Sequence, residues 1–341
     1  MKGTIEPISK RKGTSSEKDS ESAKSHAMKA VRIHKYGGPE VLQYEEAPRP
    51  KVAAPTDVLI RVHAAGVNPT DWKVREGYLK DYLPHKFPLI PGWDLSGVVE
   101  QVGSGVSRFE KGDEVYGLSD PSRDGAYAEY TVVRESEIAF KPKFLHHVHA
   151  AAVPLAALTA WQALFDTAQL QPRERVLIHA ASGGVGHFAV QLAKWKDAHV
   201  IATASKTNRN MLHDLGADEM IDYTAQRFED AARNVDIVLD PIGGEIQERS
   251  WNILKKGGRL VSLLQPPSAA KVKALGVRGA FVRTQPNGAQ LAEIAAVIDS
   301  GNLKPVVSRI LPLSEVRRAH KLSQDGHTRG KMVLRLNGPT L

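Results

Sequence analysis

The sequence contains no cysteine among its 341 residues. A chain without cysteine forms no disulfide, offers no thiolate nucleophile and has no cysteine ligands for a metal. This absence is compatible with the cytoplasm, where we expect the protein to be located. The sequence also lacks any apolar run near the roughly 20 residues that a membrane-spanning helix needs. We therefore expect no membrane association.

A concentrated block of basic residues is missing as well. The formal net charge is +8, but lysine and arginine are scattered along the chain, whereas nucleic-acid-binding segments concentrate them. We therefore expect no nucleic-acid partner. Apolar residues are nearly absent from residues 1–27, which are rich in Lys, Ser and Glu. This composition predicts a disordered N-terminal extension.

A strand, a tight turn and a helix are predicted in succession from residue 176. Residues 176–180 are almost all apolar, as in a parallel strand buried on both faces. After the turn, apolar residues recur at helical spacing up to residue 193. The turn consists of Ala181, Ser182, Gly183, Gly184, Val185 and Gly186. Gly183 allows the backbone to approach a pyrophosphate, Gly186 lets the helix lie close to the strand, and the helix N-terminus favours phosphate. The segment therefore predicts dinucleotide binding.

An acidic residue is missing at the position where folds that select NAD have one. Folds that select NAD place Asp or Glu about 20 residues after the glycines, on the ribose 2′-hydroxyl. Residues 199–213 contain neither, and Ser205, Lys206 and Arg209 occur there instead. Hydroxyl and cationic groups suit a 2′-phosphate, so we predict NADP(H) as the cofactor. An ordinary solvated loop is the alternative.

Two regions of the chain differ in their hydrophobic pattern. Residues 31–141 show short alternating runs separated by Gly and Pro, which predict a β-barrel domain. From about residue 148, helices and strands alternate, with buried strands expected at 235–240 and 259–264. This alternation predicts an α/β, doubly wound parallel sheet. A helix is expected at 289–300 and a closing strand at 331–336, which returns to the first domain.

Four motifs point to one superfamily. They are Gly-Val-Asn-Pro-Thr-Asp-Trp-Lys (66–73), Pro-Gly-Trp-Asp-Leu-Ser-Gly (91–97), Gly-Asp-Glu-Val-Tyr-Gly (112–117) and Leu-Gly-Ala-Asp (215–218). With the dinucleotide turn, they resemble the medium-chain dehydrogenase/reductase superfamily, most closely its zinc-independent quinone oxidoreductase and 2-alkenal (enone) reductase branch. The resemblance implies a GroES-like β-barrel catalytic domain split around a Rossmann domain. The implied segments are 28–147 (catalytic), 148–290 (Rossmann, NADP-binding) and 291–341 (return to the catalytic domain).

Zinc ligands are absent where the alcohol dehydrogenase branch of this superfamily has them. Asn68 stands at the position of its zinc-binding cysteine and Trp93 at that of its histidine. Tryptophan cannot bind zinc, so we expect no metal site and no Lewis acid. The His146, His147 and His149 tract is an alternative metal site, which we do not favour because no carboxylate lies nearby in the sequence.

The resemblance also implies individual site residues. The implied catalytic residues are Asn68, Lys73 and Tyr78. Asn68 and Lys73 are implied cofactor contacts as well, and they are joined in this role by Thr159, Tyr223, Pro241, Leu263 and Lys331. Pro241 and Leu263 additionally follow the ends of predicted strands, where open α/β sheets bind ligands. The alternative for each residue is an ordinary structural role, either in a turn, in a helix interior or on the surface.

A metal-free site suits hydride delivery to a conjugated acceptor. Quinones and α,β-unsaturated carbonyls accept hydride at carbon and delocalise charge onto oxygen, so orientation and enolate stabilisation are sufficient. We therefore expect an NADPH-dependent quinone or enone reductase with a small-molecule partner. The resemblance further implies a homodimer formed through an edge strand near residues 276–282. The alternatives are a cofactor-binding interaction or regulatory protein, and a reductase acting in polyketide or fatty-acid synthesis.

Overall fold

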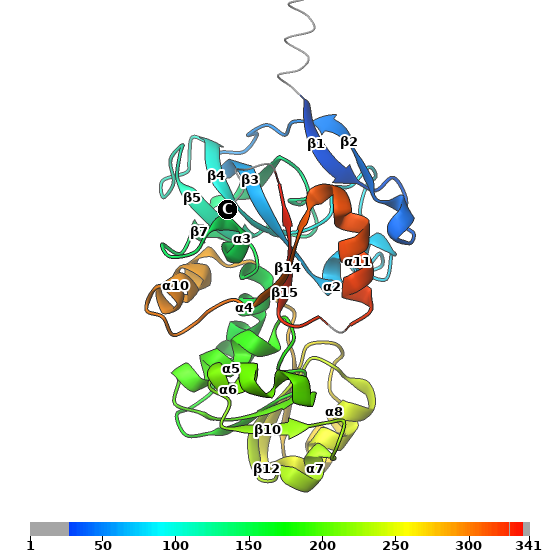
Figure 1. Cartoon of the computed structure of the whole chain (residues 1–341), viewed down its shortest axis with the longest axis vertical. Helices are drawn as coiled ribbons and strands as arrows, with labels where there is room; N and C mark the ends of the chain where they lie inside the picture. Colours follow the sequence, from blue (N-terminus) through cyan, green and yellow to red (C-terminus); the bar gives the residue numbers. More distant parts are fainter. Residues whose placement is uncertain (1–26, 327, 337–341) are drawn as a thin grey trace, which may run out of the picture.

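The structure is a computed structural model that describes residues 27–326 and 328–336. Two bodies lie one above the other in Figure 1, and α4 (Pro154–Trp161) lies between them. The predicted N-terminal extension falls outside the described residues, except for Ala27, where the first strand begins. The predicted fold, a β-rich domain together with an α/β domain that has a parallel sheet, is confirmed.

The first body is built from distant parts of the chain. Its seven-stranded sheet has the order β14-β15-β3-β4-β5-β7, β6 also pairs with β3, and β1 and β2 form a separate pair. These strands are β1 (Ala27–Arg32), β2 (Gln43–Pro48), β3 (Asp57–Val67), β4 (Asp94–Val102), β5 (Glu114–Leu118), β6 (Tyr130–Arg134), β7 (Ile138–Phe140), β14 (Val307–Pro312) and β15 (Lys331–Arg335). Because β15 pairs antiparallel with β3, the closing strand returns to the first domain as predicted.

Short helices pack against this body. They are α2 (Pro69–Arg75), α3 (His147–Ala150) and α11 (Val316–Gln324). α2 begins directly after β3, because Pro69 occupies the first helical turn, where its missing N–H costs no hydrogen bond. This placement brings Asn68 to the junction between a buried strand and a helix N-terminus.

The second body contains a six-stranded sheet with the order β10-β9-β8-β11-β12-β13, and all of its strand pairs are parallel. The strands are β8 (Arg175–Ile178), β9 (His199–Ala204), β10 (Glu219–Asp222), β11 (Val235–Asp240), β12 (Leu254–Ser262) and β13 (Arg278–Phe281), and the helices are α5 (Gly186–Trp195), α6 (Arg209–Asp214), α7 (Phe228–Ala231), α8 (Gly244–Ser250) and α9 (Ala269–Leu275). The strand predicted at 235–240 has those bounds. The one predicted at 259–264 begins earlier, because Leu254 already pairs with Val235.

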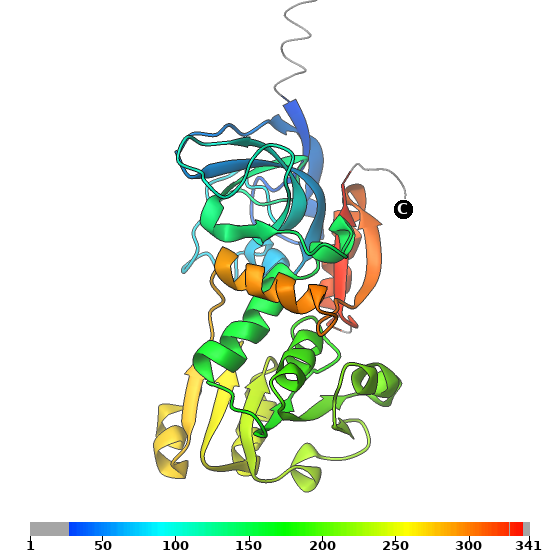
Figure 2. The same cartoon turned by 90° about the vertical axis from the view of Figure 1, so that its left-hand side faces the viewer.

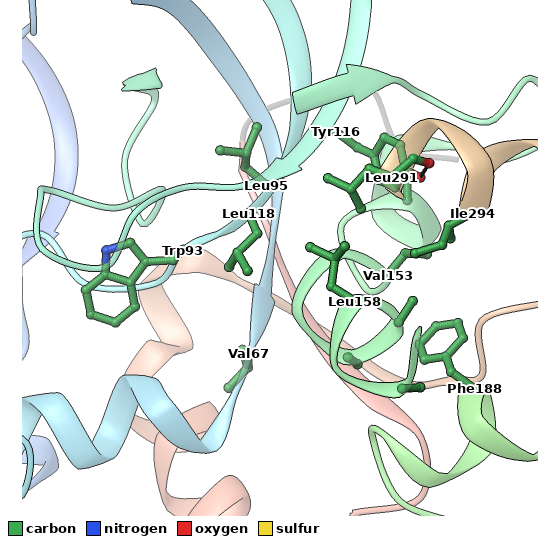
Figure 3. Packing of buried hydrophobic residues seen from close by; sticks show 14 of the residues in the cluster. Val67, Trp93, Leu95, Tyr116, Leu118, Val153, Leu158, Phe188, Leu291 and Ile294 are labelled. Atoms are coloured by element: carbon green, nitrogen blue, oxygen red, sulfur yellow. Dashed lines mark hydrogen bonds between the residues drawn. The ribbon is translucent and has the colours of Figure 1, made fainter. Parts of the chain in front are cut away.

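The helix α10 (Gly288–Asp299) lies between the two bodies, as Figure 2 shows. The hydroxyl of Tyr116 on β5 donates a hydrogen bond to the Leu291 carbonyl at 2.6 Å. Leu291 and Ile294 lie beside Val153 and other apolar residues of one continuous core (Figure 3). The predicted domain boundary at residue 290 therefore falls inside a helix that contacts both domains.

The lengths of the helices bear on the membrane prediction. Within residues 27–326 and 328–336, no helix combines the length and the apolar character that crossing a bilayer requires.

Candidate active site

The dinucleotide turn has the geometry that its small residues predict. The Gly183 N–H donates to the Ala180 carbonyl at 2.9 Å, closing the turn directly after β8. A Cβ atom at Gly186 would lie 2.4 Å from that same carbonyl oxygen, so only glycine allows α5 to begin this close to the strand. The residues between, 182–185, are half-buried. A tight turn at the N-terminus of a ten-residue helix fits a pyrophosphate.

Residue 330 attaches the start of β15 to this turn. The Gly330 N–H donates to the Ser182 carbonyl at 2.8 Å. A Cβ atom at Gly184 would lie 3.3 Å from Cδ of Lys331. The last strand of the first body therefore borders the dinucleotide turn, and Lys331 lies beside it.

A cluster of buried polar residues occupies the far side of Lys331. The Lys331 ammonium donates to the Val67 carbonyl at 3.1 Å and to Oδ1 of Asn68, and it lies 3.6 Å from Oδ2 of Asp94. The Asn68 amide in turn donates to Asp94 at 2.8 Å. Asp94 is fully buried, and Asn68 and Lys331 are each 3% exposed. Because Lys331 and Asp94 hold both ends of the amide, the orientation of Asn68 is fixed.

Burial shifts the ionisation of both charged members. Burial raises the pKa of Asp94, and the nearby Lys331 charge opposes this shift. Burial lowers the pKa of Lys331, and the charge of Asp94 opposes that shift in turn. Each ion therefore stabilises the charged form of the other in a site with little water.

Asp71 on α2 is a second buried acid beside this cluster. Its Oδ2 accepts the Tyr127 hydroxyl at 2.7 Å and the Asn68 N–H at 2.8 Å, while its buried Oδ1 has no hydrogen-bond partner among the described residues. Burial raises the pKa of Asp71 to about 7, although both hydrogen bonds lower it. Asp94, Asp71 and Tyr127 were not predicted as site residues. A single sequence does not indicate which carboxyl groups within a turn motif are buried.

The predicted adenosine-end residues gather after β9. The Ser205 hydroxyl lies 3.0 Å from the Thr207 hydroxyl and accepts from the Asn208 amide at 3.0 Å. Lys206 and Arg209 are exposed. Tyr223 is 59% exposed, and its N–H donates to the Ala204 carbonyl at 3.4 Å. The fold therefore brings Tyr223 beside the end of β9.

One acid lies near this group and was not anticipated. Asp222 ends β10, and hydrogen bonds from Thr224 and the Lys206 N–H lower its pKa. The residues between 199 and 213 contain no acid, but the parallel pairing of β10 with β9 brings Asp222 to the same edge. Its negative charge partly offsets that of Lys206.

Pro241 and Leu263 follow the carboxyl ends of the neighbouring strands β11 and β12, and Thr159 lies on α4. The Thr159 hydroxyl lies 2.7 Å from the Thr284 hydroxyl, which places residues after β13 against α4. The Leu263 N–H donates to the Asp240 carbonyl at 2.9 Å, and Pro241 follows Asp240 directly. Both lie at the edge where open α/β sheets bind ligands. Thr284 was missed because no sequence pattern links it to residue 159.

Lys73 lies on α2, and Tyr78 follows that helix. Lys73 is half-buried, burial lowers its pKa, and its ammonium lies 5.7 Å from the centroid of the Trp72 ring. Tyr78 is 67% exposed and packs edge-on against Trp72, with ring centroids 6.0 Å apart. The structure thus leaves the Tyr78 side chain largely in solvent, and it gives the Lys73 side chain no hydrogen bond to the described residues of the cluster around Lys331.

The donor set does not fit zinc. Asn68 is already bonded to Lys331 and Asp94, and the Trp93 indole donates to the Arg123 carbonyl at 3.0 Å. His147 contacts Ser96 at 2.8 Å and Glu114 at 3.1 Å. Among the described residues no group of three or more His, Cys, Asp or Glu side chains could hold a metal ion. A lysine ammonium occupies the polar centre next to Asn68 instead.

Comparison with known proteins places the chain in a family. Residues 54–143 match the alcohol dehydrogenase GroES-like domain, and residues 215–334 match the zinc-binding dehydrogenase family. The chain is 37% identical to the mouse (Mus musculus) mitochondrial NAD(P)H oxidoreductase RTN4IP1, over 92% of this chain and 90% of that protein. It is 38% identical to the tomato (Solanum lycopersicum) 2-methylene-furan-3-one reductase, over 90% of this chain and 79% of that protein.

A solved structure agrees with these relatives. The quinone oxidoreductase from Coxiella burnetii superposes with a TM-score of 0.83 at 37% identity, over 91% of this chain and all of that chain. The chain therefore belongs to the zinc-independent medium-chain dehydrogenase/reductase family of quinone and alkenal oxidoreductases, and it is an NAD(P)H oxidoreductase of that family.

Proposed function

We propose that the protein uses NADPH to reduce quinones or the C=C bond of α,β-unsaturated carbonyls. NADPH, when bound, supplies the hydride. The observation that carries the proposal is the Lys331–Asn68–Asp94 cluster, in which Asn68 is bonded to a buried lysine and a buried aspartate and belongs to no metal-ligand set. Conjugated acceptors need no such metal, because their charge delocalises onto oxygen.

The chain's own residues supply binding and orientation. The turn from Ala181 to Gly186 and the N-terminus of α5 would hold the pyrophosphate. Lys331 and Asp94 fix the Asn68 amide, which uses one of its two N–H groups on Asp94 and retains the other for a ligand oxygen. Fixing this donor before the substrate arrives stabilises developing negative charge at little reorganisation cost.

The proposal is tested by cofactor oxidation with two acceptors. We expect the purified chain to oxidise NADPH faster than NADH with 9,10-phenanthrenequinone or a short 2-alkenal, and a chelator should leave both rates unchanged. The better acceptor distinguishes a quinone reductase from an enone reductase. Normal NADPH binding without any turnover would contradict the reductase assignment and favour the binding or regulatory alternative.

Selectivity for NADPH is proposed to depend on the exposed Lys206. Replacing Lys206 with alanine should weaken NADPH binding about 10-fold to 100-fold, because a charge-assisted hydrogen bond to a phosphate is lost. NADH binding should change little, since NADH has no 2′-phosphate. Dissociation constants of both cofactors provide the measurement, and Lys273→Ala on α9 is the matched surface control. An equal effect on the two cofactors would contradict the 2′-phosphate assignment. Both cofactors must be measured because Asp222 lies beside Lys206, and folds that select NAD place an acid on the ribose 2′-hydroxyl.

We propose that the protein forms a homodimer through β13. This strand ends the six-stranded sheet, so one row of its backbone groups has no strand partner within the described residues. An edge strand of this kind can pair with the same strand of a second copy. Sedimentation velocity should show twice the chain mass of 37.2 kDa. A species of the single-chain mass at micromolar concentration would contradict this proposal.

A further inference from the structure

A hollow opens on the surface where the C-terminal ends of α4 and α5 meet. α4 continues directly into a π-helix (Gln162–Thr167), and α4 and α5 pack against each other. The ten residues of α5 make a helix about 15 Å long, with the dinucleotide turn at its other end. The hollow is therefore separate from the proposed cofactor site. It has a volume of about 440 Å³ and is lined by Trp161, Phe165, Gln169, Leu170, Gln171 and Lys196.

Three aromatic rings gather at this hollow. The Phe165 ring packs edge-on against Trp161 at 4.8 Å between centroids. The Trp195 ring lies 6.0 Å from that of Trp161 and 6.2 Å from that of Phe165. Trp161 is buried, Phe165 is half-buried and Trp195 is 36% exposed. Partly exposed rings in this arrangement can pack a further ring by offset stacking or edge-to-face contact, so the hollow suits a planar aromatic molecule.

A cation without a counter-ion borders the same rings. The Lys196 ammonium lies 3.9 Å from the centroid of the Trp195 ring and 5.7 Å from that of Phe165. Lys196 is exposed and forms no salt bridge within the described residues, and none of the described residues that line the hollow is acidic. An anionic group on an aromatic ligand would therefore find its opposite charge here, with no carboxylate to compete for it.

The backbone around the hollow adopts two uncommon conformations. The π-helix contributes Phe165, and such turns are rare and occur frequently at functional sites. Gln169 has a φ of 54°, in the left-handed region that residues other than glycine seldom adopt. The Leu170 N–H donates to the Leu164 carbonyl at 2.9 Å, and the Gln171 amide donates to the Gln169 carbonyl at 2.9 Å. These hydrogen bonds hold the wall of the hollow in place before any ligand binds.

We infer that this hollow is a second ligand site, which binds a planar aromatic molecule that carries a carboxylate or sulfonate group. The aromatic part would pack against Trp161 and Phe165, and the anionic group would bind the Lys196 ammonium. The inference does not depend on the proposed function, because none of the residues that line the hollow belongs to the proposed cofactor or substrate site.

Calorimetric titration of the full chain with 2-naphthoate and with its neutral counterpart 2-naphthylmethanol tests this inference. We expect 2-naphthoate to bind more tightly than 2-naphthylmethanol. Lys196→Gln should weaken 2-naphthoate binding about fivefold or more, because the charge-assisted contact is lost, and should leave 2-naphthylmethanol within twofold. Lys194→Gln is the matched control, since Lys194 is an exposed lysine on α5 that pairs with Asp218. Phe165→Leu should weaken the binding of both ligands, because it removes one of the rings.

Titrations with and without NADP⁺ separate the hollow from the cofactor site. Equal affinity for 2-naphthoate in both, together with the loss in Lys196→Gln but not in Lys194→Gln, would support the inference. Displacement of 2-naphthoate by NADP⁺ would overturn it, as would equal affinities of the full chain and Lys196→Gln or the absence of binding at millimolar concentration. A lower oligomeric mass in Phe165→Leu, measured by sedimentation velocity, would show that a second copy of the chain covers the hollow and would also overturn the inference.

Discussion

Replacing Lys331 with methionine is expected to lower the free energy of unfolding by about 3–5 kcal/mol, since it removes one partner of a buried ion pair. Asp94 is fully buried, and it would keep hydrogen bonds from the Asn68 amide and the Leu155 N–H but no compensating positive charge. A buried carboxylate without a counter-ion is costly because it has lost its hydration. Urea unfolding at pH 7.5 would measure the effect.

A double variant and a surface control show whether the lost stability comes from the unpaired buried charge. The double variant Lys331→Met with Asp94→Asn should recover part of the loss, because neither charge then remains buried. Lys194 and Asp218 form an exposed pair at 2.6 Å, so Lys194→Met should cost no more than about 1 kcal/mol. If Lys331→Met cost as little as this surface control, the buried cluster would have no role in stability.

Acidification is expected to unfold the protein between about pH 6.5 and pH 4. Burial lowers the pKa of His179 and His187 to about 4 and that of His320 to about 3. Each histidine therefore contributes stability that is complete above its ordinary pKa of 6.5 and is lost as the pH falls towards its folded-state value. A tenfold difference in proton affinity between the folded and unfolded states corresponds to about 1.4 kcal/mol. One such histidine therefore contributes at most roughly 3–5 kcal/mol to the free energy of unfolding at neutral pH.

Asp71 acts in the opposite direction. Its pKa is raised to about 7 from 3.8, so its contribution to stability is complete below pH 3.8 and is lost as the pH rises through 7. We expect the shifts of the three buried histidines to outweigh those of Asp71 and Asp94, whose pKa burial also raises, so the net stability should fall on acidification. Urea midpoints at pH 7.5, 6.0 and 5.0 would measure the slope.

Single variants assign the pH dependence to the buried rings. Arg75 donates to Nδ1 of His320 at 3.0 Å, and a glutamine oxygen could accept in the same place. His320→Gln should therefore flatten the decline below pH 6.5, whereas His213→Gln should not, because the His213 side chain is 84% exposed. An unchanged slope in His320→Gln would show that this ring does not take part in acid unfolding.

The sequence by itself determined the elements that a pattern of a few neighbouring residues can predict. The strand, glycine turn and α5 could be predicted because buried parallel strands are continuously apolar and Gly186 is the residue that fits beside the Ala180 carbonyl. The closing strand at residue 331 and the absence of a zinc ligand set also required only residue types at known spacings. These features identify the family and the class of cofactor.

Only the tertiary structure decided which side chains meet. Lys331 reaches Asn68 because β15 pairs with β3 across 263 residues of sequence, and Arg329 reaches Met211 across 118. Asp222 approaches Lys206 because β10 lies beside β9. Such contacts depend on how two sheets pair and pack, and no local periodicity encodes that pairing. The class of cofactor could therefore be predicted from the sequence. Which charged side chains lie around the site depends on the tertiary structure.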